Sequence, residues 1–286
     1  MIETKPEIKC DKVFSVSENK YQKNEGGLRT HGYAKAGRPK KPLVSLITVV
    51  FNGENFLEKA IQSVFSQNYD NLEYLVIDGG STDGTLGIIK KYDDKLDYWI
   101  TEPDTGIYDA WNKGLHFATG EWVSFLGADD LIMPNAFSEM LSFAEQSTDQ
   151  LDFICGRVEM YDGKTLLRTI GRPWDWNRFK RYMCVAHTGA LHRRSYFQSY
   201  GLFDTSFRIS GDYELLLRSG KALKAGFVNS VVARMQVGGQ SNGNSAVFDE
   251  ALRVRLLHGV TTPFWGRLHA KWSEIKWHLR RHLVGI

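Results

Sequence analysis

The amino-acid sequence predicts an α/β fold in which a mostly parallel sheet is flanked by helices, and three observations support this class. Between Pro42 and about Glu145, short apolar segments rich in β-branched residues alternate with segments of helical spacing. The apolar segments are hydrophobic on both faces, as buried parallel strands are. Turn-forming or acidic residues follow them. This alternation is typical of parallel βαβ units joined by right-handed crossovers.

Composition limits the class of protein. With 286 residues the chain is long enough for one α/β domain with appendages, and 42% hydrophobic residues are typical of a folded protein. The net charge of +3 gives no reason to expect a nucleic-acid partner. Cys10, Cys155 and Cys184 are far apart and lack the spacing of metal ligands, so we expect reduced, structural thiols.

The first elements follow from local composition. Residues 1–41 are polar, lysine-rich and interrupted by glycines, which predicts an extension that is partly disordered or lies over the domain. The first strand is predicted over residues 44–51, because this run is apolar and β-branched, and it ends at the turn signal Asn52-Gly53. A helix with apolar residues at helical spacing is expected over 54–66.

Three further strands are expected in the same half of the chain. One covers residues 73–77 and is followed by the glycine-rich loop 78–84; a second ends at Glu102-Pro103-Asp104. The last covers 121–126 and runs into Gly127-Ala128-Asp129-Asp130. Ligands of open α/β sheets bind beyond the carboxyl ends of the strands, so we expect these acidic loops to converge on one site.

After these strands the pattern changes. The segment 131–135 is expected to start a helix, with Pro134 in its first turn. Apolar segments between residues 152 and 170 flank Asp162-Gly163, which predicts a β-hairpin added to the sheet. Residues 172–188 are loop-like and aromatic.

Five segments together resemble the family 2 glycosyltransferases of bacterial polysaccharide assembly: SLITVVFNGENFLEKAIQSVFSQ, YLVIDGGSTDGT, EPDTGIYDAWNKG, ATGEWVSFLGADD and GDYELLLR. The resemblance covers about residues 43–220 and depends on their order and spacing, since each segment alone is a weak signal. The chain departs from the DxDD pattern common in this family, because Gly127 stands where the first carboxylate often lies. Asp129 and Asp130 remain. The departure bears on the metal requirement rather than on the fold.

The resemblance implies a GT-A fold with a Rossmann-like sheet over residues 42–262, divided into a donor half of about 42–130 and an acceptor half of about 131–262. It implies an inverting, metal-dependent hexosyl- or N-acetylhexosaminyltransferase of cell-surface polysaccharide biosynthesis. The implied donor is a nucleoside-diphosphate sugar, with a UDP-sugar favoured. The implied acceptor is a saccharide, expected to be lipid-linked.

The donor is expected to bind at the first two strand ends. Thr48, Phe51, Asn52 and Glu54 lie where the first strand opens into its helix, and Asp78 ends the second strand. In the resembling family this strand-end aspartate accepts a hydrogen bond from the base, which a carboxylate can do as a pure acceptor. The alternative is that the asparagine and aspartate are ordinary turn and cap residues.

Two other polar groups lie near the expected crevice. Asp104, Asp109 and Lys113 surround the opening of a helix, where anions bind favourably, so we expect them to contact the donor. Asp109 has the alternative role of a first-turn helix acid. Asp129 and Asp130 follow a buried strand, and their mutual repulsion calls for a cation. Oxygen ligands favour Mg²⁺ or Mn²⁺ bound with the donor diphosphate, with Asp129 also contacting the donor; the alternative is that one of the two caps a helix.

On the acceptor side, Asp212 precedes apolar residues of helical spacing. The resemblance implies that it is the general base, although Gly211 stands where a second acid is common; the alternative is an N-cap aspartate. His187 is expected to contact the acceptor, and Trp174 and Trp176 to stack on its sugar rings. A structural histidine is the alternative.

The C-terminal segment, residues 263–286, is predicted to form a basic amphipathic helix. Trp265, Leu268, Trp272, Ile275 and Leu279 form one apolar stripe among five lysines and arginines. This pattern suits an anionic membrane surface, and the alternative is a helix packed on the core or on a second subunit of a homodimer. The chain has no apolar run of roughly 18 to 20 residues and no signal-peptide core, so we expect a cytoplasmic protein, peripheral on the inner membrane if the helix binds lipid.

Two other functions fit parts of the pattern. A sugar-1-phosphate nucleotidyltransferase shares the nucleotide-binding logic but should carry a basic, glycine-rich loop after its first strand, and residues 51–55 contain no lysine or arginine. A catalytically silent scaffold on the same fold is suggested by Gly127 and Gly211 in place of acids. Dinucleotide chemistry is disfavoured because no G-x-G-x-x-G follows the first strand.

Overall fold

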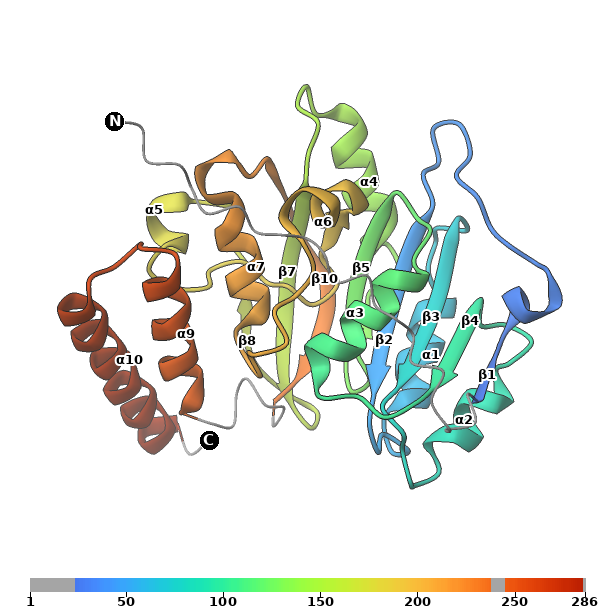
Figure 1. The fold of residues 1–286 in the computed structure, drawn as a ribbon, viewed down its shortest axis with the longest axis horizontal. Helices are drawn as coiled ribbons and strands as arrows, with labels where there is room; N and C mark the ends of the chain where they lie inside the picture. Colours follow the sequence, from blue (N-terminus) through green and yellow to red (C-terminus); the bar gives the residue numbers. More distant parts are fainter. Residues whose placement is uncertain (1–23, 238–244, 285–286) are drawn as a thin grey trace.

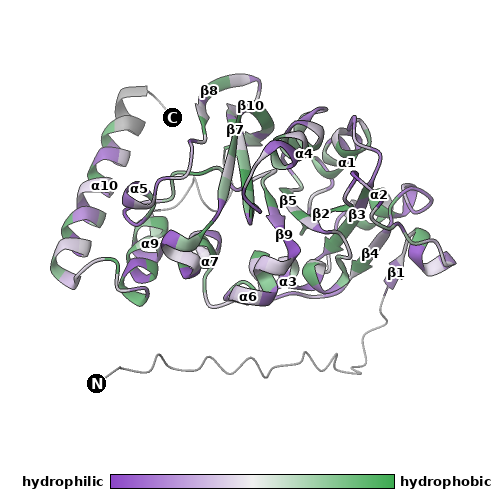
Figure 2. Ribbon diagram, turned by 90° about the horizontal axis from the view of Figure 1, so that it is seen from above, coloured by the Kyte–Doolittle hydropathy of each residue, from purple (hydrophilic) through white to green (hydrophobic). Residues whose placement is uncertain are grey.

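The computed structural model describes residues 24–237 and 245–284. Within these residues, ten strands form one mixed sheet with the order β1-β4-β3-β2-β5-β9-β7-β10-β6, and β8 pairs with β7 (Figure 1). Helices cover both faces of the sheet, with α1, α2 and α4 on one side and α3, α6 and α7 on the other (Figure 2). The predicted α/β class is therefore confirmed.

The strands are β1 (Asn24–Gly26), β2 (Val44–Val50), β3 (Leu72–Asp78), β4 (Tyr98–Thr101), β5 (Trp122–Gly127), β6 (Leu131–Ile132), β7 (Phe153–Asp162), β8 (Thr165–Ile170), β9 (Leu191–Arg193) and β10 (Ala225–Gln236). The α-helices are α1 (Leu57–Phe65), α2 (Thr85–Lys91), α3 (Ile107–Phe117), α4 (Ala136–Gln146), α5 (Trp176–Phe179), α6 (Arg194–Tyr200), α7 (Gly211–Ser219), α9 (Ala246–Leu257) and α10 (Pro263–Val284). Two 3₁₀ turns, η1 (Leu28–His31) and η2 (Gly220–Ala222), complete the described elements.

The parallel strands β4, β3, β2 and β5 form the centre of the nucleotide-type half. Every residue of β2 and β3 is buried, because helices cover both faces of these strands. Alternate side chains along β5 enter different cores: Trp122 and Leu126 join the core under α1 and α4, whereas Val123 and Phe125 join the core under α3.

The strand order changes direction between β2 and β5, since the chain runs outward from β2 through β3 to β4 and then returns to the other side of β2. In open α/β sheets this switch point opens a crevice beyond the carboxyl ends of the strands. Both β2 and β5 end there, and their following residues line the cavity described below.

The extension is partly ordered on the domain. Residues 24–26 pair antiparallel with β4, and Arg29 of η1 binds the fully buried Glu73 carboxylate of β3. The remaining residues 1–23 of the predicted extension, with Cys10, lie outside the described residues. Cys155 and Cys184 are buried free thiols, in agreement with the structural role expected for them.

The helix expected to start at residues 131–135 begins later. Leu131–Ile132 is strand β6, with Ile132 opposite Ala233 of β10, and α4 starts only at Ala136. The prediction was wrong because a strand a hundred residues away supplies the backbone partners, and local spacing cannot reveal that pairing. The predicted hairpin is confirmed as β7 and β8, which pair antiparallel around Gly163.

Candidate active site

A cavity of about 960 Å³ opens beyond the carboxyl ends of β2 and β5. Its walls come from the β2–α1 and β5–β6 loops, the start of α3, the loop before α7, the segment 181–188, and helices α9 and α10. Segments from both the donor half and the acceptor half of the described chain therefore meet around one space. Of the residues expected to form a site, it is lined by Phe51, Asn52, Asp104, Asp129, Asp130, His187 and Asp212.

The two predicted donor loops are bound to each other. The Asn52 backbone N–H donates to Ser81 Oγ at 2.7 Å, and Asn52 Oδ1 accepts from the Thr82 N–H at 2.9 Å. Asn52 has a φ of 50°, a left-handed conformation that asparagine tolerates better than most residues. Phe51 is left 65% exposed at the mouth of the cavity, where its ring is free to stack on a flat ligand.

Three of the donor residues predicted at the first two strand ends do not line the cavity. Thr48 is buried in the core and accepts a hydrogen bond from the Tyr74 hydroxyl at 3.0 Å. Asp78 is fully buried, and its oxygens accept from the Ser81 backbone and hydroxyl. Glu54 accepts from the Gly84 N–H at 2.7 Å at the start of α2. The contacts of Asp78 fit the turn role that was the alternative for it.

The polar residues predicted around the start of α3 also differ in whether they line the cavity. Asp104 lines the cavity and accepts from the Gly106 N–H at 2.9 Å, and burial raises its pKa above the ordinary value. Asp109 instead accepts from the Thr105 N–H at 2.9 Å, which closes the first turn of the helix. Lys113 lies outside the cavity, with Nζ 2.7 Å from the Pro103 carbonyl and 3.0 Å from Glu102. Of these three residues, only Asp104 lines the cavity.

Asp129 and Asp130 lie side by side in the cavity wall. Burial raises the pKa of both, and with the added repulsion from Asp129 the pKa of Asp130 reaches about 8. A Cβ at Gly127 would lie 2.9 Å from Asp129 Oδ1 and 3.0 Å from Asp130 Oδ2, so the glycine leaves room for the two carboxylates. Two buried, mutually repelling carboxylates fit a divalent cation that takes its remaining ligands from a diphosphate and water. The described residues contain no cluster of three metal-binding side chains.

Asp212 lies in the first turn of α7, partly exposed to the cavity. Its Oδ1 accepts from the Tyr213 N–H at 2.8 Å and lies 3.5 Å from the Tyr108 hydroxyl. Burial raises the pKa of Asp212 to about 6, against the lowering effect of these hydrogen bonds. A side chain at Gly211 would meet the Tyr108 ring at 2.7 Å, which explains the glycine where an acid is common in the resembling family.

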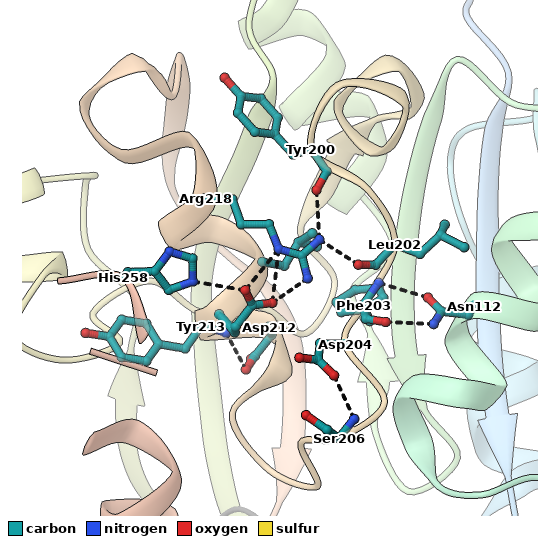
Figure 3. Close-up of polar contacts among 12 residues, drawn as sticks. Asn112, Tyr200, Leu202, Phe203, Asp204, Ser206, Asp212, Tyr213, Arg218 and His258 are labelled. Carbon is teal, nitrogen blue, oxygen red and sulfur yellow. Dashed lines mark hydrogen bonds and ion pairs between the residues drawn. The ribbon is translucent and has the colours of Figure 1, made fainter. Parts of the chain in front are cut away.

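Two other carboxylates lie near Asp212, and each has its own partners. Glu250 of α9 accepts hydrogen bonds of 2.8 Å from the backbone N–H groups of Arg208, Ile209 and Ser210, immediately before Asp212. Glu214 is bound by Arg218 and by His258 Nε2 at 2.9 Å (Figure 3). Burial alone would raise the pKa of Glu214, but hydrogen bonds from His258 and Arg218 outweigh it and the pKa falls below its usual value.

His187 faces the cavity from a buried aromatic layer. Its ring stacks on Trp111 at 5.2 Å, and its Nε2 lies 3.0 Å from Nε2 of the fully buried His192. Burial lowers the pKa of His187 to about 3, so the imidazole is neutral at physiological pH. Trp174 packs on Phe179 at 4.3 Å. Neither it nor Trp176 lines the cavity, and Arg181, Tyr182 and Met183 form this wall instead.

The wall contributed by α9 and α10 was not predicted from the sequence. Arg255, His269, Ala270, Ser273 and Trp277 line it. The sequence does contain a signal for this wall. The small residues Gly266, Ala270 and Ser273 are three or four positions apart and mark the side of α10 that packs closely on α9. The predicted apolar stripe lies on the opposite side, and all five of its side chains are exposed. No helix among the described residues has the length and apolar character that a membrane span requires.

Comparison with known sequences adds independent information. Residues 45–201 match the family model described as Glycosyl transferase family 2. The chain is 31% identical over 218 residues to an uncharacterized glycosyltransferase of Rickettsia typhi, covering 72% of this chain and 67% of the relative. It is 32% identical over 210 residues to a PGL/p-HBAD biosynthesis glycosyltransferase of Mycobacterium tuberculosis, covering 70% and 80%.

Solved structures of similar fold are more distant in sequence. The S. aureus TarS fragment 1–349 in complex with UDP-GlcNAc superposes with a TM-score of 0.64 at 17% identity, over 77% of this chain and 67% of that one. The mannosyltransferase PcManGT of Pyrobaculum calidifontis, in complex with GDP-Man and Mn²⁺, gives 0.54 at 21% identity, over 79% and 65%. At these identities the likeness shows the GT-A fold alone.

Proposed function

Because this chain belongs to glycosyl transferase family 2 and so takes its sugar from a nucleotide-sugar donor, we propose that it is an inverting, metal-dependent member of that family. The observation that carries the proposal is the single cavity that joins Asp104, Asp129 and Asp130 at one end to Asp212 at the start of α7. A donor diphosphate at the carboxylate end and an acceptor hydroxyl beside Asp212 would share this space. The aspartates then have separate roles.

Asp212 is the general base of this proposal. Its carboxylate takes the proton from the acceptor hydroxyl while that oxygen attacks the anomeric carbon from the face opposite the nucleotide. The new C–O bond forms as the bond to the diphosphate breaks, and the nucleoside diphosphate leaves with the bonding electrons. Attack from the opposite face inverts the anomeric configuration. The backbone contacts of Glu250 and the N–H of Tyr213 hold the base in position.

Asp129 and Asp130 would hold Mg²⁺ or Mn²⁺. A divalent cation bound there would neutralise charge on the departing diphosphate. The complex of PcManGT with GDP-Man and Mn²⁺ supports this assignment. Burial raises the pKa of both carboxylates, and repulsion from Asp129 raises the pKa of Asp130 further, so a cation bound between them would relieve this cost.

The donor is proposed to be a UDP-sugar, and the group transferred a hexose or N-acetylhexosamine. The TarS complex with UDP-GlcNAc supports this choice, and the exposed Phe51 ring supplies a flat surface for the base. Asp104 lies beside it and accepts hydrogen bonds, as a ligand hydroxyl would require. Thr48, Glu54, Asp78, Asp109 and Lys113 would support these loops from behind, since none of them lines the cavity.

The acceptor is proposed to be a lipid-linked saccharide of cell-surface polysaccharide biosynthesis, glycosylated at the cytoplasmic face of the membrane. The exposed stripe on α10 supports this location, because Trp265 and Trp272 are 63% and 55% exposed and Arg267 lies exposed between them. Aromatic rings and basic residues together suit an anionic lipid surface. A homodimer formed through the same stripe is the competing arrangement.

Hydrolysis of the donor, in which water takes the place of the acceptor hydroxyl, provides the test. The purified protein is incubated with UDP- and GDP-sugars, with Mn²⁺ or with EDTA, and release of nucleoside diphosphate is measured. We expect Mn²⁺-dependent release that Asp212→Asn removes and that Asp94→Asn, a matched change of an exposed aspartate outside the cavity, leaves intact. Tight nucleotide binding with no release from any donor would instead support the silent scaffold.

A further inference from the structure

A buried arginine without a carboxylate partner lies at the far end of the cavity. Arg255, in the last turn of α9, is 4% exposed. Its Nε donates to the Ala251 carbonyl at 3.1 Å, and its Nη1 donates to the Arg181 carbonyl at 3.2 Å and lies 3.0 Å from His269 Nδ1. Among the described residues, no carboxylate lies within ion-pairing distance of this guanidinium.

Two more cations lie beside it. Arg181 lines the same cavity and is exposed, and Lys180 precedes it in the chain. Neither is ion-paired with another described residue. The helix C-terminus and the carbonyl groups stabilise one cation here. They do not supply a counter-charge for Arg181 or Lys180, which an anion bound between the two cavities would provide.

The cations stand at the junction of two cavities. Arg181, Arg255 and His269 line the main cavity and also a second one of about 740 Å³. The outer wall of the second cavity is apolar, formed by Trp265, Leu268 and Trp272 of the exposed stripe. Both views of the molecule place α10 beside α9, at the end of the molecule away from β1 (Figures 1 and 2). The main cavity and an apolar groove are therefore adjacent, and the cationic wall that they share is called the neck here.

We propose that this neck binds a phosphoryl or diphosphoryl group of the acceptor, with Lys180, Arg181 and Arg255 as its ligands. The inference rests on the proposed function, since it assumes that the acceptor enters the cavity past Asp212. Guanidinium groups suit phosphate oxygens because their planar N–H donors form paired hydrogen bonds. Such a group can come from the headgroup of a lipid-linked saccharide or from a soluble phosphorylated saccharide.

His269 fits this role. Burial, followed by the charges of Arg255 and Arg181, lowers its pKa, so the imidazole is neutral at physiological pH. A neutral ring whose Nδ1 accepts from Arg255 carries its proton on Nε2. The ring thus orients the guanidinium and keeps a donor of its own without adding a fourth charge.

Inorganic pyrophosphate in EDTA is the probe for the site. Without a divalent cation, the carboxylates at the donor end of the cavity repel pyrophosphate. Its affinity, measured by calorimetry at low salt, therefore reports on the cationic side chains of the neck. We expect Lys180→Gln combined with Arg181→Gln to weaken binding at least about tenfold, and Arg181→Lys, which keeps the charge but loses the paired donors, to weaken it less. Arg267→Gln, which removes one positive charge from α10 outside both cavities, should leave it unchanged. The pyrophosphate affinity of the Arg255→Gln variant is interpreted only if circular dichroism shows that the variant folds.

No pyrophosphate binding by the unaltered protein, or equal binding by the double variant, would overturn the inference. Binding of nucleoside diphosphate with Mn²⁺ is measured in parallel, so that the proposed function and the anion site can fail separately. If the unaltered protein binds pyrophosphate but no nucleoside diphosphate, the proposed function is wrong and the anion site is retained. Farnesyl diphosphate distinguishes the sources. Tighter binding than pyrophosphate, with the gain lost in Trp272→Ser, assigns a lipid headgroup, whereas equal affinity assigns a soluble phosphorylated acceptor.

Discussion

At the scale of single residues, Asp212 has the environment a general base requires: a partly exposed carboxylate with one oxygen held by a backbone N–H. Asp212→Asn keeps this hydrogen bond and removes the basic oxygen. We expect turnover to fall by about 10² to 10⁴ while nucleotide affinity and the unfolding midpoint stay unchanged. Steady-state kinetics and calorimetry measure the two quantities.

The pH profile checks the same assignment. The base must be deprotonated, and burial raises the pKa of Asp212 to about 6. We expect kcat/KM to fall about tenfold per pH unit below this value and to level off above it. A variant with full turnover, or a profile without this acidic limb, would place the base elsewhere. Glu214 is then a poor substitute, since Arg218 and His258 already occupy its carboxylate.

The carboxylate pair gives a second residue-scale prediction. Replacing both Asp129 and Asp130 by Ala should abolish the gain in nucleotide affinity that Mn²⁺ produces, because the cation loses its protein ligands. Titration calorimetry with and without Mn²⁺ measures the gain. The Asp94→Asn variant is the control, and an undiminished gain in the double variant would show that the cation binds elsewhere.

At the scale of elements, the 3₁₀ turn η1 is attached to the sheet through Arg29. Its guanidinium binds the fully buried Glu73 carboxylate and donates to the Phe117 carbonyl at 2.5 Å. Arg29→Ala would leave a buried charge without its partner, so we expect the free energy of unfolding to fall by about 3 kcal/mol. Urea denaturation measures it. Lys41→Ala, which breaks an exposed pair with Asp70, should change it little, and an equal loss in both variants would argue against the buried pair.

Helix α10 has two different sides, and each has its own test. Because one side of α10 lines the cavity, deleting the helix would also remove part of the cavity wall. Changing exposed Trp265 and Trp272 to Ser should weaken binding to anionic vesicles by about tenfold, equivalent to about 1.4 kcal/mol, with nucleotide affinity unchanged. Vesicle co-sedimentation measures it, with Leu166→Ser on the exposed hairpin as control. Unchanged vesicle binding, together with a halved mass in light scattering, would assign the stripe to a homodimer.

At the scale of the whole molecule, the cavity joins both halves of the chain, so a ligand that fills it should stabilise the complete fold. A nucleotide at 100 times its dissociation constant adds about 2.7 kcal/mol. For a domain of this size we expect a rise in Tm of roughly 5 to 10 °C. Scanning fluorimetry with UDP and GDP, each with Mn²⁺ or EDTA, measures the rise. A larger shift with GDP than with UDP would contradict the proposed donor.

The sequence by itself determined the parallel centre of the sheet. Strands 44–50, 72–78 and 122–127 are signalled by β-branched runs, and acidic or glycine-rich turns mark their carboxyl ends. Because strand order in such a sheet leaves one crevice at those ends, Phe51, Asn52, Asp104, Asp129 and Asp130 could all be placed near it. These features depend on local propensity and on a general rule of topology.

Only the tertiary structure decided which polar groups face the cavity. Thr48, Asp109 and Lys113 are close in sequence to residues that line it, but they point elsewhere, because each finds a nearer partner in the core, a helix turn or a carbonyl. Arg255, in contrast, lines the cavity although its local sequence gives no sign of it. Nothing in its local sequence distinguishes it from a solvated helix arginine, and its burial in the neck follows from the packing of α9 against α10. Contacts between segments remote in sequence depend on tertiary packing, and no local pattern encodes them.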